Sequence, residues 1–129
     1  LSPKNFSKSD LSLISPDKNG DLIFLPSKDM LKNISAADRR RSPTEQCIKN
    51  DGSRYLTLRK YCWYWTSSPV STNQSSVTAV TTTGGFYKTL AADELCGVCP
   101  AVYLRSNILV LCGSGTAENP YALAGGGER

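Results

Sequence analysis

The residues most able to do chemistry in this chain are its five cysteines, Cys47, Cys62, Cys96, Cys99 and Cys112. Cys96-Gly-Val-Cys99 has the spacing found in redox centres and in half of a zinc site. A thioredoxin-type centre needs this pair at the start of a helix, but Pro100 and a predicted strand follow it. A zinc site needs a second ligand pair, and the chain has no histidine. We therefore interpret the thiols as coincidental and favour a reducing compartment, although odd cysteines also occur in secreted chains.

Other catalytic and metal-binding patterns are incomplete. The missing histidine excludes Ser-His-Asp and Cys-His nucleophiles. Residues 17–21 superficially resemble a calcium loop, but Gly20 stands at the fourth position and Lys28 where the bidentate Glu belongs, so we predict a turn. Asp93 and Glu94 are adjacent and would point to opposite sides of an extended chain, which argues against a paired-carboxylate site. We therefore expect no enzyme, no cofactor and no metal site.

The length and composition are those of one globular domain. The chain has 129 residues, of which 40% are hydrophobic and 20% are charged. We expect a single domain over residues 1–124, a flexible tail over 125–129, and no membrane span, because no apolar run approaches the roughly 20 residues needed. The net charge is +4, and its only basic run is Arg39-Arg40-Arg41. Since charges and aromatics are segregated along the chain, this run predicts a solvated face and not a nucleic-acid surface.

Short helices are predicted in the first half of the chain. We expect helices over 7–14 with Ser7 or Ser9 as cap, over 27–32 with Ser27 as cap, at 35–41, and over 43–49. Ser42-Pro43-Thr44-Glu45 indicates the start of the last helix, because it reads as a capping box with proline at the first helical position. Asp21–Pro26 contains a short apolar run between breakers and predicts a buried strand.

Strands dominate the second half. They are predicted over residues 55–59, 61–67, 76–82, 86–90, 101–104, 108–111 and 121–123, with a loop over 69–74. Gly84-Gly85 indicates a hairpin, because both positions can take positive φ. Helices early and strands late predict an α+β fold with a mostly antiparallel sheet.

Residues 61–87 form an uncharged tract rich in aromatic and hydroxyl side chains, bracketed by Lys60 and Lys88. Tyr61, Trp63 and Trp65 alternate along a predicted strand, so they share one face, and we expect that face in the core. Tyr64 would then point the other way, toward the surface. Neutral surfaces of Tyr, Ser, Thr and Asn are typical of binding sites, because they combine rigid aromatic area with adaptable hydrogen bonding.

Five segments within residues 20–123 resemble an uncharacterised bacterial and phage domain family. They are IFLPSKDML (23–31), RSPTEQCIKNDG (41–52), YWTSSP (64–69), GVCPAVYLRS (97–106) and GSGTAENPYAL (113–123). That family is similar to the formylglycine-generating-enzyme variant of the C-type lectin fold, which implies this fold for the chain, here without the further N-terminal segment that the family usually has. The family commonly has Arg where this chain has Cys99. The active-site cysteines of the enzymatic branch are spaced differently from Cys96 and Cys99, so that activity is not transferred.

The resemblance also implies a mode of diversification. Many members of this fold are variable proteins of diversity-generating retroelements in phages and gut bacteria, whose codons near the C-terminus are mutated while the scaffold stays constant. Thr81–Cys96 is similar in position to their variable region.

We therefore expect a non-enzymatic, lectin-like ligand-binding domain, displayed on a phage particle or bacterial surface. Its partner would be a protein or glycan on a cell surface, and homo-oligomerisation is left open. Replacing Phe86 and Tyr87 with alanine is expected to abolish binding without lowering stability. The predicted contact residues are Tyr64, Ser71, Thr72, Asn73, Thr81, Thr82, Thr83, Phe86, Tyr87, Thr89, Leu90, Asp93, Glu94 and Leu95.

Two alternatives remain at this point. The first is a structural subunit of a phage tail, fibre or bacterial surface assembly, whose apolar face packs against a neighbour. The second is a thiol-dependent or copper-dependent oxidase that resembles the formylglycine-generating branch.

Overall fold

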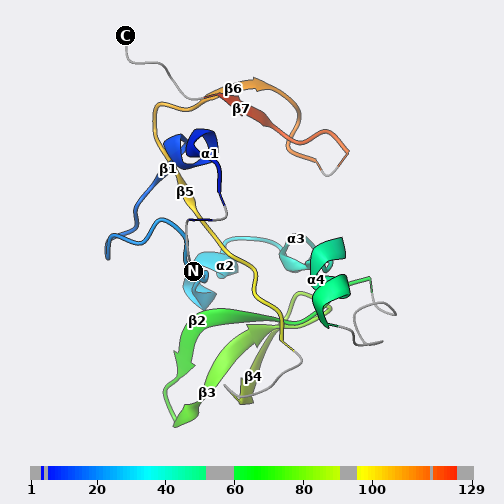
Figure 1. Ribbon diagram of the computed structural model, residues 1–129. Coiled ribbons are helices and arrows are strands. Elements are labelled where there is room, and N and C mark those ends of the chain that lie inside the picture. The colour runs from blue at the N-terminus through cyan, green and yellow to red at the C-terminus, as the bar shows by residue number, and fades with distance from the viewer. Residues whose placement is uncertain (1–3, 5, 52–59, 91–95, 117, 125–129) are drawn as a thin grey trace. The chain divides into compact units, whose positions relative to one another are not determined.

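The computed structural model describes residues 4, 6–51, 60–90, 96–116 and 118–124 (Figure 1). These residues form short helices and antiparallel sheets, which confirms a small α+β fold. The chain divides into two compact units, one of residues 25–100 and one of residues 1–24 with 101–129. The single domain over 1–124 stays a prediction, and the tail at 125–129 lies outside the described residues. None of the described helices is long and apolar enough to cross a membrane.

A three-stranded antiparallel sheet is the centre of the unit 25–100. Its strands are β2 (Tyr64–Val70), β3 (Asn73–Val80) and β4 (Phe86–Leu90), in the order β2-β3-β4 (Figure 1). The loop predicted at 69–74 is wrong, because both strands extend into it and leave only a turn at 71–72. Proline lacks an N–H and is tolerated in sheets at bulges, and the register of β2 shifts on both sides of Pro69. The strand predicted at 55–59 lies outside the described residues.

The predicted hairpin is confirmed between β3 and β4. The Thr81 N–H donates to the Gly85 carbonyl at 2.9 Å, and the Gly84 N–H donates to the Thr81 carbonyl at 2.9 Å. Of the two hairpin glycines, only Gly84 has positive φ, at +80°. A Cβ at Gly84 would lie 1.8 Å from the Ala36 carbonyl oxygen, so the hairpin loop packs directly against the helix that contains Ala36.

Three short helices belong to the same unit, namely α2 (Lys28–Lys32), α3 (Ala36–Arg39) and α4 (Glu45–Asp51). Ser27 caps α2 as predicted, since its hydroxyl accepts from the Met30 N–H at 3.2 Å. The predicted start of α4 is wrong by two residues. Thr44 takes the capping role that the sequence assigned to Ser42, because its hydroxyl accepts from the Cys47 N–H at 3.1 Å.

The core of this unit lies between α2 and the sheet. Leu31, Tyr64 and Val80 are buried together, and Phe86 and Cys99 pack against them. Tyr64, Val80 and Phe86 are cross-strand neighbours, so their side chains form one row on the face that α2 covers. Burial of one such side chain contributes about 1.5–3 kcal/mol.

The surface position predicted for Tyr64 is therefore wrong. Its side chain is 1% exposed, and its hydroxyl donates to the Arg39 carbonyl at 2.8 Å. Trp63 and Trp65 lie on the opposite face and are only half-buried. Alternation identified correctly which residues share a face, but the better-buried face is the one that carries a satisfied tyrosine hydroxyl.

Arg39 and Arg40 are half-buried and do not form the solvated face expected of the arginine run, whereas Arg41 is exposed. The Arg39 guanidinium donates to the carbonyls of Gly84 at 2.7 Å, Leu31 at 3.1 Å and Ile34 at 2.8 Å. It joins the end of α2 to the β3–β4 hairpin. Arg40 stacks on the Tyr61 ring at 4.6 Å. A guanidinium presents five donors in a fixed plane, which suits it to collecting several carbonyls at once.

In the described part of the second unit there are one short helix and four short strands. They are α1 (Lys8–Ser12), β1 (Ile14–Ser15), β5 (Tyr103–Leu104), β6 (Leu109–Cys112) and β7 (Ala122–Ala124). Ser7 caps α1 with a full capping box, as one of the two predicted caps. β1 pairs with β5 and β6 with β7, both antiparallel.

The strand predicted over Asp21–Pro26 is wrong. This segment forms only an isolated bridge, between Phe24 and Ala101, although Ile23 is buried as expected. An apolar run shows that a segment is buried, but a strand also needs a neighbour over several residues. The turn predicted before it is confirmed, because the Asp17 carboxylate accepts from the backbone N–H groups of Asn19 and Asp21.

Candidate functional site

The described part of the unit 25–100 contains a groove. Its volume is about 510 Å³, within the range of small-molecule sites. It lies between α2 and the sheet, and residues of β2, β3 and β4 complete it. The lining residues are Lys28, Asp29, Lys32, Ser68, Pro69, Val70, Ser71, Thr78, Phe86, Tyr87 and Lys88.

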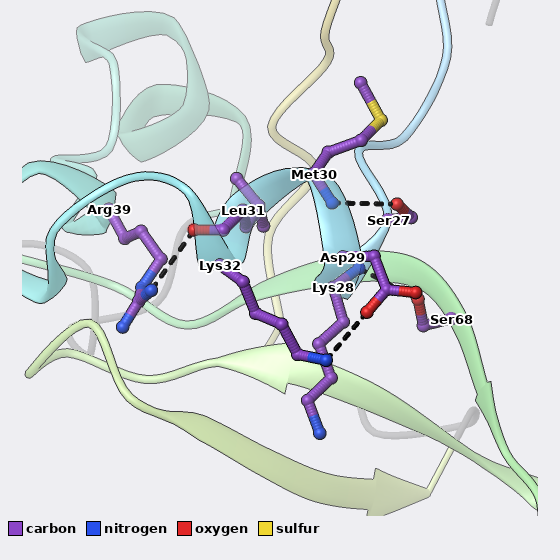
Figure 2. A network of polar contacts seen from close by, with 8 residues as sticks. All are labelled: Ser27, Lys28, Asp29, Met30, Leu31, Lys32, Arg39 and Ser68. Atoms are coloured by element: carbon purple, nitrogen blue, oxygen red, sulfur yellow. Dashed lines mark hydrogen bonds and ion pairs between the residues drawn. The ribbon is translucent and has the colours of Figure 1, made fainter.

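Three lysines from two distant segments line this groove. Lys28 and Lys32 are four residues apart on α2, which places them on one side of the helix. In Figure 2 both side chains leave α2 on the same side and extend toward the sheet. Lys88 lies in β4 opposite Thr78, on the same face of the sheet as Phe86. The groove therefore collects positive charge from α2 above and from β4 below.

Among the described residues, Asp29 is the only acidic one that lines the groove, and Lys32 neutralises it. The Lys32 ammonium lies 2.8 Å from an Asp29 carboxylate oxygen (Figure 2). That hydrogen bond, followed by the charge of Lys32, lowers the pKa of the Asp29 carboxyl below its ordinary value. Asp29 is therefore ionised at neutral pH. Lys28, Lys32 and Lys88 against Asp29 give the lining a formal charge of three minus one, or +2.

Packing and hydrogen bonds position Lys28. Its backbone N–H donates to the Ser68 hydroxyl at 2.8 Å, which ties the start of α2 to β2. Its ammonium lies 5.6 Å from the centre of the Phe86 ring, and the Arg39 guanidinium lies 4.5 Å from the same ring. Two cations therefore contact one aromatic ring, an attraction that strengthens as water is excluded. Phe86 is a partly buried support for the groove and not an exposed contact residue.

Two exposed predicted contact residues, Ser71 and Tyr87, border this groove. The Tyr87 side chain leaves β4 on the face opposite Phe86 and Lys88. Tyr87 is 59% exposed, and its ring meets the edge of Trp63 with centroids 5.4 Å apart. Ser71 and Thr72 are exposed in the turn between β2 and β3. The structure brings Ser71, Phe86 and Tyr87 together in the lining of the groove.

Other predicted contact residues are not part of this site. Thr81, Thr82 and Thr83 lie in the hairpin loop, at the opposite end of β3 from the turn at 71–72. Eight strand residues separate the two positions by roughly 25 Å. The Thr81 and Thr83 hydroxyls bond one another at 2.9 Å. Tyr64 is excluded by its burial.

The structure describes the remaining predicted contact residues only in part. Thr89 is half-buried in β4. Asn73 and Leu90 belong to strands, but their side chains are not described. Asp93, Glu94 and Leu95 lie outside the described residues.

Sequence reasoning missed the lysines of the groove. The signals were present: Lys28 and Lys32 have helical spacing, and Lys88 alternates with Phe86 in a predicted strand. They were overlooked because charge and aromatic residues are segregated along the chain. Folding brings α2 and β4 to the same groove, although 56 positions separate Lys32 from Lys88.

Cys62 and Cys99 both pack within the folded chain. Cys62 is buried, and its thiol donates to the Arg41 carbonyl at 3.5 Å. Burial raises the pKa of the Cys62 thiol, which disfavours the reactive thiolate. Cys99, at the position where the resembling family commonly has Arg, packs as a small hydrophobe against the core. Within the described ranges, no group of three or more Cys, Asp or Glu side chains could hold a metal ion.

Comparison with known proteins gives one result. Residues 9–106 match the family described as Domain of unknown function (DUF6273). This segment includes parts of both compact units and all the residues that line the groove. Neither a curated protein nor a solved structure matches the chain.

Proposed function

We propose that this chain, which belongs to the DUF6273 family, is a non-enzymatic ligand-binding domain. The ligand contacts the groove between α2 and the sheet and the exposed residues Ser71, Thr72 and Tyr87 beside it. The observation that carries the proposal is a groove of about 510 Å³ whose lining includes Ser71 and the 59% exposed Tyr87 of the outer strand β4. Tyrosine with adjacent serine and threonine hydroxyls is typical of recognition surfaces, because few side-chain torsions must be ordered on binding.

Three features support the choice of this surface. The Tyr87 ring packs on the edge of Trp63, which restricts its motion. The turn at 71–72 joins two paired strands and is anchored by them. The floor of the groove is fixed by Phe86, which packs on the core. Such preorganisation reduces the entropy cost of binding.

The finer assignment follows the sequence resemblance. We propose a C-type-lectin-like domain of the formylglycine-generating-enzyme type, displayed on a phage particle or bacterial surface, with a protein or glycan on a cell surface as ligand. Diversification over residues 81–96 would change Tyr87 and Thr89 on one face of β4, whereas Lys88 is not reachable from a mutated Asn codon. Variation there would alter the surface beside the groove without replacing core residues of β3.

Binding to glycan and bacterial-surface arrays, with Tyr87→Ala as the variant, tests the proposal. We expect Tyr87→Ala to lower binding at least tenfold while the free energy of unfolding stays within about 1 kcal/mol of the parent, because the side chain is exposed and loses mainly its edge contact with Trp63. Tyr87→Phe is the matched control that separates the ring from its hydroxyl. Phe86→Ala is not a clean probe, since Phe86 packs on the core and its loss costs about 3 kcal/mol or more. Array ligands that bind Tyr87→Ala and the parent equally would refute the proposed surface.

The alternative, a structural subunit, has one observation in its favour. β6 exposes Leu109, Val110 and Leu111 to 56%, 58% and 64%. Consecutive exposed apolar side chains on a strand are typical of surfaces that another chain covers. Light scattering with size separation would measure the mass in solution. A stable oligomer that Leu109→Ser and Leu111→Ser dissociate would favour assembly over recognition, whereas a monomer at all concentrations would remove this alternative.

A further inference from the structure

We propose that the groove binds an anionic group of the ligand, a carboxylate or a sulfate, between the ammonium groups of Lys28 and Lys88. The inference rests on the proposed function, since it names the chemical class that the same site would recognise. It uses residues outside the predicted contact set, and so it is tested separately.

The charge of the lining is the first step. Three lysines and one aspartate line one groove, and Asp29 is paired with Lys32. Among the described residues, neither Lys28 nor Lys88 forms an ion pair. Two ammonium groups that face one concave surface repel each other, and an anion placed between them removes that repulsion. A neutral ligand would leave it in place.

The positions of the lysines are the second step. Lys28 is held against the Phe86 ring, and its backbone is bonded to Ser68. Lys88 projects from a strand whose register with β3 is continuous from Phe86 to Leu90. Both cations therefore start from backbone that is fixed by hydrogen bonds, which reduces the ordering cost when an anion binds. Hydrogen bonds between ammonium and carboxylate or sulfate are among the stronger ones in proteins.

The third step concerns Asp29, whose carboxylate competes with a bound anion for the Lys32 ammonium. Its carboxylate forms an ion pair with the Lys32 ammonium at 2.8 Å and is ionised at neutral pH. A bound anion is therefore repelled by Asp29 and does not gain the full attraction of Lys32. Replacing Asp29 with Asn removes one negative charge and releases Lys32. An anion site predicts that this substitution strengthens binding, an effect that a purely structural role of Asp29 would not produce.

Calorimetric titration of the full chain with glucuronate, glucose 6-sulfate and glucose tests the inference. We expect the two anions to bind and glucose not to bind, with affinity falling between about 20 mM and 200 mM salt as screening increases. Lys28→Gln with Lys88→Gln should weaken binding about tenfold or more, since two charge-assisted contacts are lost. Asp29→Asn should strengthen binding severalfold. Lys49→Gln, on α4 and outside the groove, removes one lysine charge elsewhere in the unit and should change nothing.

The outcomes separate this inference from the proposed function. A sulfated oligosaccharide that binds where the monosaccharides do not would support an anion carried on a polymer, and equal binding would support a small free anion. If none of the anions binds, or if the double lysine variant and Lys49→Gln behave alike, the inference is wrong. An array ligand that depends on Tyr87 would in that case leave the proposed function standing. Lysine-dependent binding of glucuronate with no Tyr87-dependent ligand would refute the proposed surface and retain the anion site.

Discussion

Gly84→Ala should be the most damaging small substitution in the unit 25–100. Gly84 has φ +80°, and a Cβ there would lie 1.8 Å from the Ala36 carbonyl oxygen, a backbone atom. The left-handed conformation costs a residue with Cβ about 1–2 kcal/mol. Relief of the clash requires the hairpin and α3 to separate.

The separation also breaks a hydrogen bond. The Gly84 carbonyl accepts from the Arg39 guanidinium at 2.7 Å, and a bond to a charged donor contributes about 1.5–3 kcal/mol. Alanine restricts the unfolded chain more than glycine does, which offsets the loss by about 0.4–1 kcal/mol. The expected net loss of stability is about 3 kcal/mol, equivalent to a decrease of about 1.5 M in the urea midpoint.

Gly85→Ala is the matched control. The nearest atoms to a Cβ there are the hydroxyls of Thr81 and Thr83, at 3.5 and 3.7 Å, which are ordinary contacts. We expect its stability to stay within about 0.5 kcal/mol of the parent. Tryptophan fluorescence during urea unfolding is a suitable assay, because both tryptophans, Trp63 and Trp65, belong to this unit. Equal midpoints for the two alanine variants would refute the packing of the hairpin against α3.

Three further predictions concern Tyr64 and Cys62, whose side chains are buried. Tyr64→Phe should destabilise the unit by about 1–2 kcal/mol in the same urea assay, because the Arg39 carbonyl loses its 2.8 Å hydrogen bond; an unchanged midpoint would mean that water replaces the hydroxyl. In native protein at pH 8, a disulfide reagent should modify the exposed Cys47 and Cys112 at least tenfold faster than the buried Cys62, and mass spectrometry of the labelled peptides would show it. The raised pKa of Cys62 means that the folded state favours the neutral thiol, so this contribution to stability is present below about pH 9 and is lost as the pH rises above it; a Cys62→Ala variant should lack this part of the alkaline loss.

The sequence by itself determined the elements whose signals act over three or four residues. Ser27 was identified as a helix cap, and the Gly84-Gly85 turn and the strand after it were placed correctly. Caps and turns are readable because hydroxyl capping and positive φ are satisfied within the segment itself. The start of α4 was wrong by two residues because Thr44 and Ser42 are both suitable caps, and local chemistry does not choose between them.

Which face of the sheet is buried was decided only by tertiary structure. Alternation separates Tyr64 from Trp63 and Trp65, but it does not say which set a helix covers. Leu31 of α2 packs on the face of Tyr64, and Arg39 supplies the carbonyl that makes burial of the tyrosine hydroxyl acceptable.

The groove depends on the same packing. Lys28 and Lys88 are 60 positions apart, and only the docking of α2 on the sheet and the register of β4 bring them to one surface. Local propensities carry no information about such a distance, because the energy that closes it comes from burying Leu31, Tyr64 and Val80 together.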